Sequence, residues 1–190
     1  MLKDRPWGYG LVSIVLHWTS AIAILFLFGL GIYMVDLGYY DPWYNQAPRL
    51  HISIGLCLLL LMCLRLVWRV TSRNPEPLSS YSTAVRRSAA AAKLLLYLGV
   101  FAVLVTGYLI TSAKGQGPSL FGWAEFPVLL QLSGDGVDRA GRLHEWLSWA
   151  VVIIAAGHGA AALLHQFVIR DGTLSRMLKP ATNPSTKRNK

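Results

Sequence analysis

Long blocks of apolar residues, separated by polar segments, run along most of the chain. Each block holds roughly the 20 apolar residues that a helix needs to cross a hydrocarbon core about 30 Å thick. The first block is too long for the core of a cleaved signal peptide, so we interpret it as a retained span. The pattern predicts an all-α fold, an integral membrane four-helix bundle with spans at about 11–35, 49–70, 93–111 and 142–169.

The polar segments between the predicted spans differ in character. Residues 36–48 are rich in Tyr and Trp, which favour the membrane interface. Residues 71–92 form a linker with the turn sequence N-P-E-P, and residues 114–141 form a longer loop with an apolar patch that we expect on the membrane surface. We therefore predict one membrane domain, residues 1–175, followed by a basic cytoplasmic tail, residues 176–190.

Composition agrees with a membrane protein. The 190 residues are 54% hydrophobic and only 14% charged, against about 25% charged residues in a soluble domain. A net charge of +9 could by itself indicate nucleic acid, but the cations lie beside the apolar blocks, so we expect membrane lipid as a partner and no nucleic acid.

The charge distribution also predicts an orientation. The N-terminal lead, the linker with its flanks and the tail hold 14 Lys and Arg against 3 acidic residues, whereas the other two loops hold 4 against 5. Because cytoplasmic loops are enriched in Lys and Arg, both termini are expected in the cytoplasm.

Three of the five histidines fall in the last span and share one face of it. His144 and His158 are fourteen residues apart, and His165 follows after seven more. At about 100° per residue these steps nearly complete whole turns, and His144 and His158 stand about 21 Å apart along the helix. Two imidazoles near opposite sides of a membrane suggest two stacked metal or haem sites.

The distance along the chain to the nearest flanking arginine, which marks the water interface, sorts the histidines by depth. His51 and His144 each lie two residues from an arginine and form an outer layer. His17 and His158 each lie twelve residues from one and form a deeper, cytoplasmic layer. His165 lies five residues from the next arginine and has no partner at its depth. Two matched pairs predict two bis-histidine haems, because six-coordinate iron takes one imidazole on each face.

Other residues fit this prediction, and each also has a simpler interpretation. A porphyrin needs small neighbours, which Gly55, Gly157 and Gly159 would supply, although small residues also serve close helix packing. A lone histidine in a span can equally be a hydrogen-bonding group or a proton relay. A zinc site is disfavoured because each layer offers two imidazoles, and zinc usually takes three or four ligands. The cations available for haem propionates are Arg49 and Arg142 in the outer layer and Arg65 or Lys93 in the inner layer.

Several of these features together resemble the bacterial cytochrome b561 family, small four-span dihaem cytochromes of the inner membrane. The resemblance covers nearly the whole chain. It rests on His17-Trp18 in the first span, His51 with Gly55 in the second, L-R-L-V-W-R followed by N-P-E-P, H-E at 144–145 and H-G-A-A-A-L-L-H at 158–165.

The resemblance implies a fold, cofactors and an activity. His51 and His144 would ligate the iron of an outer haem b, and His17 and His158 that of an inner haem b. The family transfers electrons to or from the ubiquinone pool, and some members oxidise superoxide at the outer face. His165 matches a histidine that the family associates with the quinone site.

Our leading hypothesis is an enzyme, a superoxide oxidase that reduces ubiquinone. Outer-face Arg49, Lys114 and Arg142 would attract the anion, and His165, assisted by Lys93 and Arg65, would serve the quinone. The rival is a non-catalytic, electron-carrying anchor for a partner dehydrogenase, hydrogenase or soluble cytochrome. A third hypothesis is a histidine protein for proton or metal transport, which would favour carboxylates inside the spans; Glu145 is the one acidic residue inside a predicted span.

Overall fold

The computed structural model describes residues 1–113 and 115–182. Four of its helices are long and apolar enough to cross a membrane, as the sequence predicted. A short antiparallel hairpin, a π-helix and one further short helix complete the described chain. In order, the elements are α1 (Leu11–Val35), α2 (Gln46–Thr71), α3 (Thr83–Ser112), β1 (Ser119–Leu120), β2 (Ala124–Glu125), α4 (Asp135–Leu164), η1 (His165–Ile169) and α5 (Ser175–Leu178).

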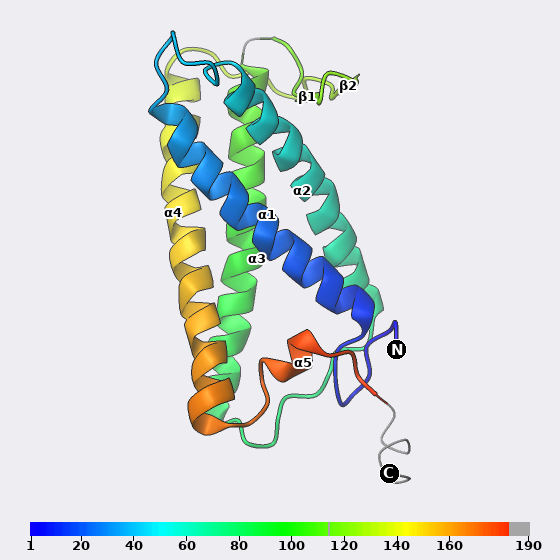
Figure 1. Cartoon of the computed structure of the whole chain (residues 1–190). Coiled ribbons are helices and arrows are strands. Elements are labelled where there is room, and N and C mark those ends of the chain that lie inside the picture. Colours follow the sequence, from blue (N-terminus) through cyan, green and yellow to red (C-terminus); the bar gives the residue numbers. More distant parts are fainter. Residues whose placement is uncertain (114, 183–190) are drawn as a thin grey trace.

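The long helices form two hairpin pairs. Helix α1 packs mainly on α2 and α3 on α4, whereas contact between α1 and α4 is sparse. Figure 1 shows α1 crossing the other helices obliquely, with the β1–β2 hairpin and the α1–α2 connection at one end of the bundle. The N-terminal lead, α5 and the last described residues lie at the opposite end (Figure 1). We call these the outer end and the inner end.

The first span has the predicted bounds, the second begins three residues early at Gln46, and the other two begin much earlier than expected. Helix α3 starts at Thr83 instead of residue 93, because the Ser82 hydroxyl accepts a hydrogen bond from the Val85 backbone N–H and caps the helix. Helix α4 starts at Asp135 instead of residue 142, and its first turn carries acidic residues that favour a helix N-terminus. Part of the expected linker and part of the expected outer loop are therefore helical.

The N-terminal lead is fixed to the start of α1 by one buried carboxylate. Asp4 accepts hydrogen bonds from the Gly10 N–H (2.6 Å) and the Ser13 hydroxyl (2.7 Å), and the Trp68 indole donates to the same hydroxyl. A Cβ atom on Gly10 would lie 2.2 Å from the Leu2 carbonyl oxygen, so only glycine permits this approach. The lead and α2 therefore hold the inner end of α1 in place.

An apolar cluster fills the middle of the bundle. It combines buried residues from all four long helices: Leu27, Leu58, Met62, Val100 and Val151. Val151 lies midway along α4 between His144 and His158, so the cluster separates the two predicted histidine layers.

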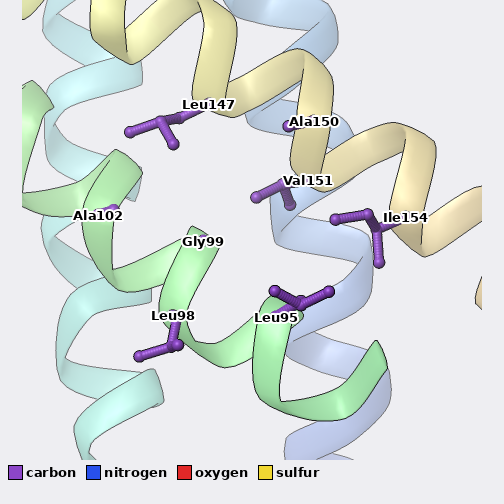
Figure 2. A pocket seen from close by; sticks show the side chains of 8 residues that line it. All are labelled: Leu95, Leu98, Gly99, Ala102, Leu147, Ala150, Val151 and Ile154. Atoms are coloured by element: carbon purple, nitrogen blue, oxygen red, sulfur yellow. The ribbon is translucent and has the colours of Figure 1, made fainter. Parts of the chain in front are cut away.

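A crevice of about 300 Å³ runs along the seam between α3 and α4 (Figure 2). A Cβ atom on Gly99 would lie 2.8 Å from a Val151 methyl group, so this glycine allows the two helices to approach. Because its lining is aliphatic, the crevice offers no groups for redox or proton chemistry. Among the side chains that border it are Leu95, Leu98, Ala102, Leu147, Ala150 and Ile154.

The chain after α4 folds back across the inner end. The Trp18 indole donates to the Met177 carbonyl (2.8 Å), and the Ala181 N–H donates to the Tyr9 carbonyl (2.8 Å). Arg176 donates to the Glu76 carbonyl (3.0 Å), which connects this segment to the α2–α3 linker. Residues 176–182 of the predicted tail therefore pack on the bundle, residues 183–190 lie outside the described part, and the domain boundary at residue 175 stays a prediction.

Candidate functional site

The outer histidines meet between α2 and α4. The ring centres of His51 and His144 lie 6.2 Å apart, at an angle of 68° between the ring planes. Metal–nitrogen bonds to imidazole are about 2 Å long, so two rings that bind one metal from opposite sides have centres roughly 6 Å apart. The separation of His51 and His144 therefore suits one iron atom between them.

The hydrogen bonds of His144 select one of its nitrogens as a ligand. Its Nδ1 lies 3.0 Å from the Val103 carbonyl oxygen and 3.2 Å from the Thr106 hydroxyl. A carbonyl can only accept, so Nδ1 carries the proton and Nε2 keeps its lone pair. Metal-binding histidines are commonly oriented in this way by a second hydrogen bond. Sequence reasoning missed Val103 and Thr106, because they come from a span without histidines.

Each outer imidazole packs against a glycine of the neighbouring helix. A Cβ atom on Gly31 of α1 would lie 3.4 Å from His51 Cε1. A Cβ atom on Gly107 of α3 would lie 3.0 Å from His144 Cε1 and 3.3 Å from its Nδ1. The sequence analysis did not identify either glycine, although both stand inside otherwise apolar spans, where glycine often marks a close approach.

The space around the remaining predicted glycines also suits a flat, bulky cofactor. A Cβ atom on Gly55, Gly157 or Gly159 would meet no atom of the described residues within 4 Å. Among the described residues His51 Nδ1 is buried without a hydrogen-bond partner, which is costly unless another group satisfies it. These features fit a haem in the outer layer, held by His51 and His144.

The inner histidines have charged neighbours instead. Arg65 donates to His17 Nδ1 (2.8 Å) and to the Ser20 hydroxyl (2.5 Å), and its guanidinium lies 5.4 Å from the centre of the Tyr97 ring. His158 is an electrostatic neighbour of His17, and Lys93 in turn is a neighbour of His158. The structure thus brings Arg65 and His17 into contact and places His158 and Lys93 within electrostatic range of this layer.

The Arg65 contact restricts how His17 can bind a metal. An arginine N–H can donate only to an unprotonated Nδ1, which leaves the proton of a neutral His17 on Nε2. Ligation through Nε2 requires that proton on Nδ1. A haem therefore fits the inner layer if Arg65 releases His17 Nδ1. Arg65 would keep its other two partners, the Ser20 hydroxyl and the Tyr97 ring.

The outer layer is covered by the β1–β2 hairpin. Ser53 lies two residues after the ligand candidate His51, and its hydroxyl is buried. This hydroxyl accepts a hydrogen bond from the Phe121 N–H (2.9 Å) and donates one to the Ser119 carbonyl (3.1 Å). Two of the predicted anion-attracting residues, Arg49 and Arg142, have exposed side chains at this end. The third, Lys114, lies outside the described residues.

His165 lies at the inner edge, at the start of the π-helix η1. Its Nδ1 contacts Asp171 (2.5 Å), and its ring meets the edge of Tyr81, with the ring centres 5.2 Å apart. No hydrogen bond of the described residues joins it to Lys93, so the joint quinone site of these two residues stays a prediction. Sequence reasoning did not pair His165 with Asp171, although the Asp-Gly turn sequence at 171–172 is a signal of chain reversal.

Known proteins resemble this chain over most of its length. The family model described as prokaryotic cytochrome b561 matches residues 8–180. Cytochrome b561 homolog 2 of Escherichia coli (strain K12) is 48% identical over 175 residues, which cover 92% of this chain and 93% of that protein. Cytochrome b562 of Cereibacter sphaeroides is 30% identical, covering 91% of this chain and 96% of the relative. The probable superoxide oxidase CybB of Yersinia pestis is 26% identical, covering 90% and 95%.

These matches assign the chain to a family. A family model that covers nearly the whole described bundle, together with a relative that is 48% identical, agrees with the resemblance found in the sequence. Four membrane-spanning helices and imidazoles between them are the parts that a membrane cytochrome requires. The chain belongs to the prokaryotic cytochrome b561 family and is a membrane b-type cytochrome that transfers electrons.

Proposed function

We propose that this protein oxidises superoxide at the periplasmic face of the bacterial inner membrane and reduces ubiquinone at the cytoplasmic face. The observation that carries the proposal is the line of histidines along α4 and the π-helix η1 that follows it. His144 lies 6.2 Å from His51 between ring centres, His158 neighbours His17, and His165 stands one step further at the inner edge. A relative that is 26% identical is named a probable superoxide oxidase, which supports this choice of substrate.

The proposed reaction balances with one quinone for each pair of superoxide anions. Two superoxide anions each lose one electron and give two molecules of oxygen. One ubiquinone gains both electrons and two protons and gives ubiquinol. Haem b, when bound by the two histidine pairs, supplies an iron that accepts and donates one electron at a time.

The protein's own residues would bind, orient and protonate the reactants. Exposed Arg49 and Arg142, with Lys114, supply positive potential that draws a small anion to the outer layer. His165 supplies an N–H for one quinone oxygen. Arg65 and Lys93 lie on the same side and favour the build-up of negative charge during reduction.

Stopped-flow mixing of the purified, haem-loaded protein with superoxide tests the proposal. We expect haem reduction faster than superoxide dismutates by itself, and reoxidation when ubiquinone is added. The Arg49→Glu/Arg142→Glu variant should slow the first phase several-fold at low salt and less at high salt, because exposed charges are screened. Haem reduction no faster than in an unrelated haem protein would reject superoxide as the substrate.

A second candidate function is favoured by the exposed aromatic residues of the outer end. Tyr40 is 95% exposed and Trp123 is 90% exposed, in segments expected at the membrane surface, where aromatic side chains can contact lipid or a partner protein. The protein would then carry electrons for a partner dehydrogenase, hydrogenase or soluble cytochrome. Slow reaction with superoxide, together with fast haem reduction by an added soluble redox protein, would support this alternative.

A further inference from the structure

The inner end of α4 has an unusual geometry that returns the chain to His165. Residues His165–Ile169 form a π-helix, a conformation that often marks functional sites. Arg170 follows in the left-handed region, with φ of 60°, and such a conformation is uncommon for residues other than glycine. The N–H groups of both Arg170 and Asp171 then donate to the His165 carbonyl. This turn places the Asp171 side chain against the imidazole six residues earlier.

Both carboxylate oxygens of Asp171 have hydrogen-bond partners in this position. One carboxylate oxygen contacts His165 Nδ1 at 2.5 Å. The other accepts from the N–H of Thr173 (3.0 Å) and from its hydroxyl (2.5 Å), and that hydroxyl also meets the Tyr81 hydroxyl (2.6 Å). The side chain of Asp171 is only 6% exposed and that of His165 is 15% exposed. The pair is therefore shielded from bulk water and connected to the α2–α3 linker through Tyr81.

The carboxylate keeps its charge in this environment. Burial raises the pKa of the Asp171 carboxyl, but the hydrogen bonds from Thr173 and His165 outweigh burial and hold that pKa below its usual value. A charged carboxylate can only accept hydrogen bonds. His165 Nδ1 must therefore carry a proton, and the ring can offer only Nε2 to a ligand.

We propose that Asp171 is a positioning residue that directs His165 Nε2 to a quinone oxygen. This inference rests on the proposed quinone reduction. In the proton-transfer step, the Nε2–H bond of the imidazolium breaks and an O–H bond forms on the quinone oxygen. The electron that accompanies this proton comes from superoxide, which is oxidised at the outer end. Water at the inner end then returns a proton to Nε2. Throughout the step Asp171 holds the Nδ1 proton and keeps the ring in one orientation.

A purely structural role for Asp171 is the rival explanation, because its bonds to Thr173 form a common turn. The variant Asp171→Asn separates the two roles. An asparagine oxygen can still accept from Thr173 and keep the turn, but its NH₂ group would face Nδ1 and favour the opposite tautomer. Glu76→Gln is a matched control, because it removes another carboxylate at the inner end, and the hydrogen bonds found for Glu76 use only its backbone.

The test uses the full haem-loaded protein, reduced by stoichiometric dithionite and mixed with a short-chain ubiquinone. We expect Asp171→Asn to lower the maximal rate of haem reoxidation by about 10- to 100-fold, the scale seen when the residue that orients a metal-binding histidine is removed. The ubiquinone concentration at half-maximal rate should change much less. Glu76→Gln should behave like the wild type, and Asp171→Glu should restore part of the rate.

Two further measurements make the outcome decisive. In the reduced, diamagnetic protein labelled with ¹⁵N-histidine, the His165 signal should show a protonated Nδ1 in the wild type and an unprotonated Nδ1 in Asp171→Asn. In a His165→Gln background, Asp171→Asn should cause no further loss of rate.

Three results would overturn the inference. An unchanged ¹⁵N signal in Asp171→Asn, or a further loss of rate in the His165→Gln background, would reject the positioning role while His165 keeps its function. A wild-type reoxidation rate in His165→Gln alone would reject the proposed quinone end itself. The His165→Gln variant by itself therefore distinguishes the failure of the proposed function from the failure of this inference.

Discussion

The outer and inner histidine layers share helix α4 but have opposite surroundings. In the outer layer, His144 donates to a backbone carbonyl, and both rings pack against glycines of neighbouring helices. In the inner layer, a guanidinium contacts His17, an ammonium group neighbours His158, and a histidine–carboxylate pair lies at the edge. One layer has neutral partners in fixed positions, and the other has charged and titratable ones.

This difference suits a protein that moves electrons in one direction. A hydrogen bond from a ligand ring to a carbonyl fixes the ring and raises its basicity, which slightly favours the oxidised form of a bound metal. Cations near the inner layer stabilise the reduced form, because an added electron is attracted by positive charge in a medium of low dielectric constant. Protonatable groups at the same end can neutralise a reduced quinone. The comparison therefore predicts electron acceptance at the outer layer and proton-coupled release at the inner one.

Removal of one ligand from either layer should have the largest effect. The wild type should contain about two b haems per chain, one for each bis-histidine pair. We expect His51→Ala to lose the outer haem and His17→Ala to lose the inner haem, because each leaves iron with one imidazole. A pyridine haemochrome assay should give one haem in each variant, and His165→Ala should keep both. One haem or none in the wild type would remove the basis of the comparison.

A glycine substitution should weaken the outer layer alone. In Gly107→Ala the new methyl group would meet His144 at about 3.0 Å, so the ring has to move. Overpacking of this kind costs about 1–3 kcal/mol, which corresponds to roughly a 5- to 150-fold loss of outer haem affinity. Gly29→Ala is the control, because a Cβ atom there meets none of the atoms that the structure describes within 4 Å. Haem titration of the two variants measures the effect, and equal affinities would mean that Gly107 does not support the ligand.

The sequence predicted the four spans well because hydrophobic blocks report directly on membrane depth. It underestimated α3 and α4, because the added turns hold charged residues, alanines and glycines and lie beyond the strongly apolar run of each span. Ser82 as a cap and Asp135 in the first turn are local signals that extend these helices. The hairpin β1–β2 was not predicted, since two-residue strands carry no periodicity.

The candidate site was predictable in its histidines but not in their partners. Counting residues from flanking arginines matched His51 with His144, and the structure brings their rings together; their role as ligands stays a prediction. Helix rotation determines the hydrogen bond between Arg65 and His17 and the packing of Gly107 on His144. The contact of Asp171 with His165 depends on the irregular turn that follows the π-helix η1. Sequence spacing fixes neither of these to within a residue.

Neutralising the cation of the inner layer should separate the two haems electrochemically. We expect Arg65→Gln to lower the midpoint potential of the inner haem by roughly 60 mV, which is tenfold in the equilibrium constant for one electron. The outer haem should not change, because the apolar cluster around Val151 separates the layers. A spectroscopic redox titration resolves the two values. A shift of equal size in both haems would show that the layers are not electrostatically distinct.

The smallest expected effect is a pH dependence confined to the inner end. Because the folded pKa of Asp171 lies below its usual value, its contribution to stability is present above about pH 4, the unfolded value, and is lost as pH falls through the folded value. Loss of one hydrogen-bonded carboxylate in Asp171→Asn should lower the unfolding midpoint by about 2–4 °C at pH 7. That difference should stay constant down to about pH 5 and shrink below pH 4. Thr106→Val removes a neutral hydroxyl beside His144, so its effect on the midpoint should not change over the same range. Thermal unfolding of the wild type and the two variants across this pH range measures the effect. A pH-dependent effect of Thr106→Val, or a constant effect of Asp171→Asn, would contradict the assignment of charge chemistry to the inner layer alone.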